Sequence, residues 1–364
     1  MALFGIGKTK AYLGIDIGTA GIKLAQFQEE KGRAKLHTYA YTERGPADLS
    51  ASLLDATEPT AKTIQAMMKK AKVTATRANA GIPTTSVFSS VISVPRLAEK
   101  EQRGAIELQA RKLISSPLED MVLDAKNLST PEEEKLPPAQ RPKYIRVLLT
   151  AAPKPLVKKY LDIFKVAGLE VGSVEPETFA LIRSLVGKDK STLMLVDVGA
   201  VRTSVLVVSG GIPYLTRSID VGGLKFTKAA AAALGVPESE AESMKADFRS
   251  FGALPPGSIP AVFEPVVAQI VNEIAFSLKL FTGLEEQAIA GGAPAKMVEK
   301  IILTGGGAQL PNLDAYLSAK LNMRVFRGDP WARVLYPEDS RPLLDDVGPR
   351  FSVAVGLAMR DFES

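Results

Sequence analysis

The chain has 364 residues, enough for two or more domains, and its 45 basic and 40 acidic residues give a formal net charge of 45 − 40 = +5. It contains no Cys and one His, His37, which excludes disulfides and thiol catalysis and disfavours histidine metal sites and histidine-dependent nucleophiles. The sequence has no basic block with interleaved aromatic residues, so we expect no nucleic-acid partner.

A glycine turn between two apolar strands opens the predicted fold. Residues 12–27, YLGIDIGTAGIKLAQF, predict a strand that reaches Asp16, a turn through Gly18-Thr19-Ala20-Gly21, and a returning strand that carries Lys23. A third strand, RAKLHTYAY, follows. A plain hairpin needs neither the carboxylate nor the lysine, so this pair of residues calls for a functional explanation.

Alternating helical and strand patterns follow this hairpin. Residues 60–72 predict an amphipathic helix, residues 79–97 are rich in strand formers, and residues 98–114 predict a second helix. The proline-dense and charged stretch 129–143 predicts a mobile loop. The start of the chain, MALFGIGKTK, lacks the apolar core of a signal peptide and no apolar run reaches the length of a spanning helix, so we expect a cytoplasmic protein.

The hairpin pattern recurs half a chain later. Residues 193–209, LMLVDVGAVRTSVLVVS, repeat the strand, the Asp-x-Gly turn and the second strand, and the segment GGIPYLTRSID supplies a third. Asp197 lies 197 − 16 = 181 positions after Asp16. A twofold recurrence at this scale predicts two similar halves, because solenoid repeats are far shorter.

The remainder of the second half is mainly helical. A glycine pair opens a helix at VGGLKFTKAAAAALGV, a further helix is predicted over 237–252, and residues 261–283 predict a long helix with one apolar side. The segment KIILTGGGAQLPNLDAYLSAKLNMRV predicts a strand, a triple-glycine turn, a helix and a strand.

Together these turns have the parts of a phosphate-binding site. Glycines let backbone N–H groups approach phosphate oxygens, hydroxyls and cations beside them add donors and charge, and a carboxylate at a strand end can hold Mg²⁺ through waters. The triple glycine at 305–307 has neither the spacing of a dinucleotide fingerprint nor a P-loop sequence, which leaves a flat turn on which a base or ribose could lie.

These segments resemble known motifs. GIDIGTAGIK, VDVGAVRTS and ILTGGGAQLPNL are similar to the two phosphate motifs and the adenosine motif of the actin/Hsp70/sugar-kinase ATPase superfamily, and SVEPETFAL and FSVAVGLAMR resemble its two connecting helices. Within the superfamily the chain most resembles the PilM family of type IV pilus assembly proteins, relatives of FtsA. The segments IPTTSVFSSVISVPRL, ARKLISSPLED and AAPKPLVKKYLDIFKVAGL carry that part of the resemblance.

The resemblance implies an α/β fold of the actin/Hsp70-like ATPase class, with two similar halves flanking a nucleotide cleft and a small α/β insertion of the FtsA/PilM type in the first half. It implies a first subdomain at 1–81 with 171–190 and the C-terminal helix 350–364. The inserted subdomain is expected at 82–170. The second half is expected at 191–349, with a smaller subdomain at about 224–260.

The resemblance also implies the residues of the site. ATP or ADP would be held by Gly18, Thr19, Ala20, Gly21, Lys23, Gly199, Arg202, Thr203, Gly222, Gly223, Glu242, Lys245, Gly305, Gly306, Gly307 and Gln309. Asp16 and Asp197 would lie on the Mg²⁺ side, and Glu175 matches the residue that positions water in hydrolysing relatives. Because carboxylates are favoured at a helix N-terminus, a purely structural role for Glu175 is equally open.

By resemblance, the function would be that of an ATP-binding scaffold with weak or no ATPase activity in the inner-membrane platform for pilus assembly and twitching motility. Its partner would be the N-terminal cytoplasmic tail of PilN, with PilO and the pilus motor ATPases as indirect partners and a homodimer as a further expectation. Membrane association would be peripheral and only through the partner. Candidate residues for the partner groove are Ile114, Pro117 and Leu118, for which packing after a helix end is the alternative.

Two other functions stay open from the sequence. A small-molecule kinase of the sugar type would share the fold, but the chain shows no unassigned Asp in a segment of the kind that sugar kinases carry. An FtsA-like or filament-forming bacterial actin would share it too, although FtsA-like chains end in an amphipathic membrane helix and this one stops at AMRDFES.

Overall fold

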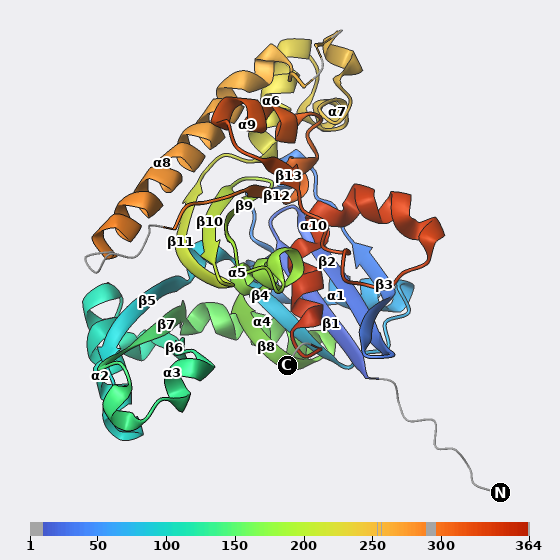
Figure 1. Cartoon of the computed structure of the whole chain (residues 1–364). Coiled ribbons are helices and arrows are strands. Elements are labelled where there is room, and N and C mark those ends of the chain that lie inside the picture. Colours follow the sequence, from blue (N-terminus) through green and yellow to red (C-terminus); the bar gives the residue numbers. More distant parts are fainter. Residues whose placement is uncertain (1–9, 253, 256, 289–295, 363–364) are drawn as a thin grey trace, which may run out of the picture.

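The computed structural model describes residues 10–252, 254–255, 257–288 and 296–362. Two five-stranded sheets form the body of the molecule, and a three-stranded sheet lies to one side (Figure 1).

The first sheet takes its order from the N-terminal hairpin. Its strands lie in the order β3-β2-β1-β4-β8, with β1, β4 and β8 parallel and β2 antiparallel to both of its neighbours. The bounds are β1 Ala11–Gly18, β2 Gly21–Glu30, β3 Arg33–Tyr41, β4 Arg77–Ile82 and β8 Glu170–Pro176. Helices α1 (Thr57–Lys70) and α4 (Lys154–Ala167) cover one face, where Ile64, Tyr160 and Phe164 are fully buried against the strands.

The second sheet repeats this topology. Its order is β11-β10-β9-β12-β13, again a three-strand antiparallel unit followed by two parallel strands. The bounds are β9 Thr192–Val198, β10 Thr203–Ser209, β11 Ile212–Ile219, β12 Ile301–Thr304 and β13 Val325–Arg327. The two similar halves predicted from the repeated hairpin are therefore present.

One face of the second sheet is covered by helices of the second half: α6 Gly223–Leu234, α7 Glu238–Met244, α8 Glu264–Ala288 and α9 Leu313–Leu321. The segment Ala261–Glu286, which includes most of α8, is long and apolar enough to cross a membrane by length and composition, and 39% of the tested window is buried. Three side chains of α8 itself, those of Val267, Ile270 and Ile274, are fully buried in the core of the second half. We therefore interpret α8 as the core helix that the apolar periodicity of 261–283 predicts.

A smaller unit interrupts the first half between β4 and α4. Its sheet has the order β5-β7-β6, from Phe88–Pro95, Tyr144–Pro153 and Met121–Asn127, and α2 (Glu99–Leu113) covers it. Helix α4, which falls inside the range 82–170 expected for the insertion, packs instead on α1 and β8, because Ile163 and Phe164 are buried in the core of the first half.

The prediction of a loop over 129–143 is wrong in part. Residues Pro131–Lys135 form a short helix, α3, whose N-terminus has a complete capping box between Thr130 and Glu133. Arg96 donates to the Glu134 carboxylate at 2.9 Å, and Arg141 donates to the Glu134 carbonyl at 2.7 Å. The prolines and charges that suggested disorder therefore serve as helix starts and ion pairs.

Helix α10 (Arg341–Met359) joins the two halves together with α5 (Glu177–Leu181), which continues as a π-helical turn over Ile182–Val186. The backbones approach without side chains between them, since a Cβ at Gly14 of β1 would overlap the Ala354 carbonyl of α10, and one at Gly356 would overlap the Ala180 carbonyl of α5. Glycine at these two positions is what allows α10 to lie against β1 and α5 at once.

We predict that Gly356→Ala lowers the melting temperature strongly, because the added methyl group has only backbone atoms to displace and overpacking of this kind costs about 1–3 kcal/mol or more. Gly104→Ala on α2 is the matched control. A Cβ there would meet nothing within 4 Å, so the substitution should stabilise α2 by about 0.5–1 kcal/mol. Thermal unfolding followed by circular dichroism measures both, and equal melting temperatures for the two variants would contradict this account of the packing.

Candidate functional site

A cavity of about 1000 Å³ separates the two halves. The carboxyl ends of β1 and β9 meet there, and each is followed by its glycine turn. Most of the residues predicted for the site line this cavity: Asp16, Gly18, Thr19, Ala20, Lys23, Asp197, Gly199, Arg202, Gly223, Glu242, Lys245, Gly305, Gly306, Gly307 and Gln309.

The first turn holds an ion pair between the two residues that set this hairpin apart. Lys23 Nζ lies 3.2 Å from Asp16 Oδ2, and both side chains are largely buried. The pairing follows from the strand register, in which Asp16 and Lys23 are direct partners across β1 and β2. Lys23 also lies beside Gly18, whose hypothetical Cβ would be 3.0 Å from the ammonium. A side chain at position 18 would therefore crowd the lysine.

Arg44, in the segment after β3, fastens that segment over the same turn. Its guanidinium donates to the carbonyl oxygens of Thr19 at 3.0 Å and Ala51 at 2.8 Å, and also to the carbonyl of Asp48. The backbone N–H of Arg44 donates to the Ala20 carbonyl at 2.9 Å. Residues 41–46 and 49–54 consequently form one wall of the cavity.

The second turn is held by the glycine pair. The N–H of Gly223 donates to the Gly199 carbonyl at 2.9 Å, and that of Leu224 donates to the Ala200 carbonyl at 2.7 Å. A Cβ on Gly222 would lie 2.6 Å from the backbone nitrogen of Arg202. Gly222 thus packs against the backbone of the turn and does not line the cavity, whereas Gly223 lines it.

Arg202 lines the cavity but is already paired. Its guanidinium donates to Asp220 at 2.7 Å and to the Thr85 hydroxyl of the first half at 2.9 Å. Thr203 is fully buried and its hydroxyl donates to the Val221 carbonyl at 2.7 Å, so its side chain points away from the cavity.

Three carboxyl groups gather around Lys23: Asp16, Asp197 and Glu177. Removal from water, together with the charges of Asp16 and Asp197, raises the pKa of Glu177 to about 8. Burial and the Asp16 charge raise the pKa of Asp197 to about 6, while Lys23 lowers both pKa values. A cluster of like charges this close favours a proton or another cation among them.

The opposite end of the cavity is formed by α6, α7 and the triple glycine. Lys245 Nζ lies 2.7 Å from the Glu242 carboxylate and donates to the Thr227 hydroxyl at 2.9 Å. Burial lowers the pKa of Lys245, and Glu242 opposes that shift. Gly305 has φ of +83°, a conformation that favours glycine, and its N–H donates to the Pro349 carbonyl of α10 at 3.0 Å.

Arg350 of α10 connects this end of the cavity to the first half. Its Nε donates to Gln309 Oε1 at 2.6 Å, and its guanidinium pairs with Glu43 of the segment after β3. Arg350 therefore bridges the triple-glycine region and the cavity wall that Arg44 holds.

Several predicted residues lie elsewhere. Glu175 does not line the cavity; its carboxylate pairs with Arg183 at 2.7 Å and Arg360 at 3.2 Å. Gly21, with φ of +142°, packs on Thr42 outside the cavity lining. Ile114 and Leu118 are buried in the core beneath α2, so Pro117 alone of the three groove candidates is exposed.

Sequence reasoning missed Glu177, Arg44 and Arg350. Glu177 was hidden by its neighbour, since two acids flank Pro176 and only the fold shows which one faces the cavity. Arg350 lies in GPRFSVAVG, just before a segment whose resemblance to a connecting helix is recognisable. For Arg44 no local pattern marks a role, because its partners are backbone carbonyls: those of Asp48 and Ala51 just after it and that of Thr19 in the first turn.

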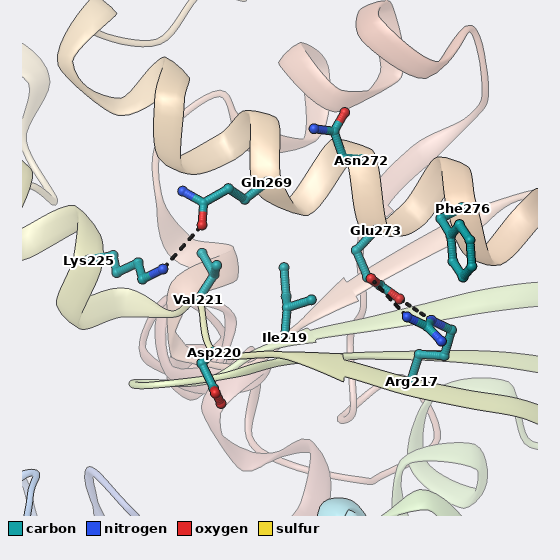
Figure 2. Close-up of a pocket in the computed structure, with 9 residues that line it drawn as sticks. All are labelled: Arg217, Ile219, Asp220, Val221, Lys225, Gln269, Asn272, Glu273 and Phe276. Atoms are coloured by element: carbon teal, nitrogen blue, oxygen red, sulfur yellow. Dashed lines mark hydrogen bonds and ion pairs between the residues drawn. The ribbon is translucent and has the colours of Figure 1, made fainter.

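A second hollow, of about 600 Å³, lies between β11 and α8 (Figure 2). Its charged groups already satisfy one another, because Arg217 pairs with Glu273 and also lies over the Phe276 ring at 4.6 Å, and Lys225 donates to Gln269 at 3.1 Å. The remaining acid, Asp220, pairs with Arg202. The cavity between the halves, with its unneutralised carboxyl groups, is the better candidate site.

Comparison with known proteins identifies the family. The family model described as "Type IV pilus assembly protein PilM" matches residues 14–362. Among curated proteins, the cell division protein FtsA of Escherichia coli K12 is 26% identical over 236 residues, which cover 58% of this chain and 54% of FtsA. The chain thus spans about half the length of the curated relatives that it matches.

Solved structures confirm the predicted fold class. A chain of a PilM–PilN type IV pilus biogenesis complex superposes with a TM-score of 0.80 at 24% identity, covering 97% of this chain and 99% of that one. MreB5 of Spiroplasma citri bound to ADP superposes with a TM-score of 0.50 at 12% identity, covering 96% and 95%. The fold is that of the actin-like ATPases.

Glu177 and Glu175, two residues apart, are predicted to respond oppositely to substitution by Gln. Glu177 has a raised pKa in the folded state, so its contribution to stability is lost as pH rises from about 4.5 through about 8. Glu177→Gln should therefore stabilise the protein above pH 8 by up to about 5 kcal/mol, and near pH 5 by less than about 1 kcal/mol.

Glu175→Gln should destabilise the protein instead, by about 3 kcal/mol, because Arg183 and Arg360 lose a largely buried partner. Melting temperatures of both variants and the unsubstituted chain, measured across this pH range with a metal chelator present, test the pair. If Glu177→Gln and Glu175→Gln shifted stability in the same direction at high pH, the assignment of Glu177 to the charged cluster would be wrong.

Proposed function

The chain belongs to the PilM family of type IV pilus assembly proteins, and on that premise we propose that it is a cytoplasmic, ATP-binding scaffold of the pilus platform at the inner face of the cell membrane. The observation that carries the proposal is the facing of two strand ends across one cavity. Asp16 with its glycine turn comes from one half, and Asp197 with its own comes from the other. Such an arrangement clamps a polyphosphate from both sides.

In this proposal the phosphates lie between the two turns. The backbone N–H groups near Gly18, Thr19 and Gly199 would donate to phosphate oxygens, and Lys23 would exchange its contact with Asp16 for the phosphate charge. The ribose and base would lie toward Glu242, Lys245 and the glycines at 305–307. Support comes also from MreB5, a protein of the same fold whose solved structure holds ADP.

The charged cluster suits a divalent cation that is held together with the phosphates. Within the described residues no group of three or more His, Cys, Asp or Glu side chains is arranged to hold a metal directly. Mg²⁺ keeps most of its waters and binds through few carboxylates plus substrate phosphates. Asp16 and Asp197 would then hold Mg²⁺ from outside its water shell, and the cation would neutralise the carboxyl groups that now favour a proton.

We propose weak or no ATP turnover. Glu175, the residue that the resemblance marked for positioning water, is paired with two arginines away from the cavity. Glu177 faces the cavity instead, and a carboxyl whose pKa is about 8 stays largely protonated near neutral pH, which makes it a poor base there. Glu177 could act as a base only where a positive charge bound beside it lowered its pKa, as Lys23 does in part.

For the partner we propose the N-terminal cytoplasmic tail of PilN, since the PilM–PilN complex contains a chain of the same fold over nearly its full length. We propose that the tail binds to the inserted three-stranded unit. Because Ile114 and Leu118 are core residues, Pro117 is the one of the three groove candidates that could contact the tail. PilO and the motor ATPases would be reached indirectly, and a homodimer is part of the proposal.

The nucleotide proposal is tested with Lys23→Met. Loss of a buried charge-assisted contact to phosphate should weaken ATP binding about 10- to 100-fold in the presence of Mg²⁺, as measured by isothermal titration calorimetry. Lys112→Met, on the exposed face of α2, removes the same charge elsewhere and should bind ATP normally. The proposal would be refuted if the unsubstituted chain showed no ATP binding, or if Lys23→Met bound ATP with the same affinity as the unsubstituted chain.

The partner proposal is tested with the same variants. A synthetic PilN tail should bind the ATP-loaded protein at least about tenfold more tightly than it binds Lys23→Met, since coupling between two sites is typically 5- to 150-fold. Fluorescence anisotropy of a labelled tail gives both affinities. Normal binding of the tail by a cleft variant that no longer holds ATP would separate the two functions and contradict the idea of a nucleotide-loaded scaffold.

A further inference from the structure

The end of the first sheet that faces away from the cavity is strongly basic. Strands β1, β4 and β8 are parallel and begin at this end, the turn between β2 and β3 lies here, and helices α1 and α4 finish here. Figure 1 shows the start of β1 at this end of the sheet, where Phe362 packs on Tyr12. We call it the basic end, after the residues named below.

The strands and their turn contribute the first group. Lys10 precedes β1, and Lys31 and Arg33 flank the glycine of the turn between β2 and β3. All three are exposed, and no ion pair is recorded for them within the residues that the structure describes. Lys31 takes a left-handed backbone with φ of +52°, a conformation in which glycine or asparagine is more usual than lysine.

The helices contribute the second group. Lys69 and Lys70 end α1, Lys72 follows, and Lys165 ends α4 beside the exposed apolar side chain of Val166. The two helix ends are adjacent, because Gln65 of α1 donates to the Val166 carbonyl of α4 at 3.0 Å. These four lysines are also exposed and have no ion pair recorded in the described part of the chain.

The acids at this end do not balance these seven cations. Glu30 pairs with Lys35 and Glu170 pairs with Arg77, which leaves the exposed Glu29. Farther in, Asp361 pairs with Arg360. Seven basic residues without a recorded ion pair against one such acid, Glu29, leave this end of the described chain with a positive excess.

We propose that the basic end binds an anionic membrane surface directly. Five strands at about 4.8 Å spacing make an edge about 20 Å wide, and basic side chains gathered along such an edge act together within a Debye length of about 8–10 Å. The apolar Val166 among the lysines suits a lipid interface better than it suits a nucleic-acid backbone. This contact would strengthen membrane association in addition to binding through a protein partner, and it does not depend on nucleotide binding.

The orientation that follows keeps the cavity accessible. Strand β1 runs eight residues from the basic end to the glycine turn, about 26 Å at about 3.3 Å per residue. A membrane beneath the basic end would therefore leave the cavity facing away from the lipid.

The test uses the full chain and vesicles of phosphatidylcholine with about one third phosphatidylglycerol, compared with pure phosphatidylcholine, in flotation assays. Each basic residue near an anionic surface strengthens partitioning about fivefold. The variant Lys69→Glu, Lys70→Glu, Lys72→Glu should bind the anionic vesicles about a hundredfold more weakly than the unsubstituted chain. Added salt should weaken binding of the latter steeply.

A matched control reverses three exposed lysines of the inserted unit, Lys112→Glu, Lys126→Glu and Lys143→Glu, and should keep most of the binding. Lys31→Glu with Arg33→Glu provides an independent variant on a different element, in case the change at the end of α1 disturbs folding. ATP affinity serves as the folding check and should be unchanged in every variant.

Three results would overturn the proposal. The first is that the unsubstituted chain binds pure phosphatidylcholine vesicles as tightly as it binds the anionic vesicles. The second is that the control variant loses as much binding as the other variants. The third is that a short DNA duplex competes with the vesicles at equal salt. The last result would assign the basic end to nucleic acid instead. Failure of ATP binding alone would refute the nucleotide site and leave the membrane surface standing.

Discussion

The distance between the two halves of the molecule depends on how closely helix α10 approaches each of them. At Gly14 and Gly356 its backbone lies against β1 and α5 with no side chain between. At Pro349 its carbonyl accepts from the Gly305 N–H at 3.0 Å and from the Thr304 hydroxyl at 3.1 Å, both at the end of β12. One helix thus contacts the middle of β1 in the first sheet and the end of β12 in the second. Because packed backbones cannot be compressed, the separation between the ends of β1 and β9 is set by α10 and α5, and with it the width of the cavity.

That fixed width explains the electrostatics of the site. Asp16, Asp197 and Glu177 are brought together around one lysine, which cannot neutralise three charges. The folded chain bears this cost in its ligand-free state, as the raised pKa values of Glu177 and Asp197 show. Groups that are held together at the expense of stability are typical of binding sites, where the ligand supplies the missing charge. A polyphosphate alone would worsen the repulsion, so the nucleotide that we propose would have to bind together with a cation.

Much of this was predictable from the sequence, and the failures have physical reasons. The repeat of the pattern around Asp16 and Asp197 predicted the two similar halves, because a strand that ends on Asp-x-Gly is a local pattern visible in both copies. Glu175 and Glu177 could not be told apart, since the choice depends on where β8 ends and α5 begins around Pro176. The helix at Pro131–Lys135 was missed because its capping box lies in a stretch whose composition suggests disorder. Arg350 binds side chains that are distant in sequence, and Arg44 binds backbone carbonyls, of which that of Thr19 is distant, so no local pattern encodes either role.

The direction of the chain accounts for the opposite character of the two ends of the first sheet. Parallel strands gather their carboxyl ends at one edge, where Asp16 and the glycine turns collect, and their starts at the other. The helices run back against the strands, so α1 and α4 present their C-terminal ends, with partial negative charge, at the edge where the strands begin. Lysines at those helix ends are favoured for that reason alone. Lys31 and Arg33 are not, because they lie at the turn between β2 and β3 and end no helix. Folding therefore explains part of the basic end, and the part that it leaves unexplained is what points to an anionic surface outside the chain.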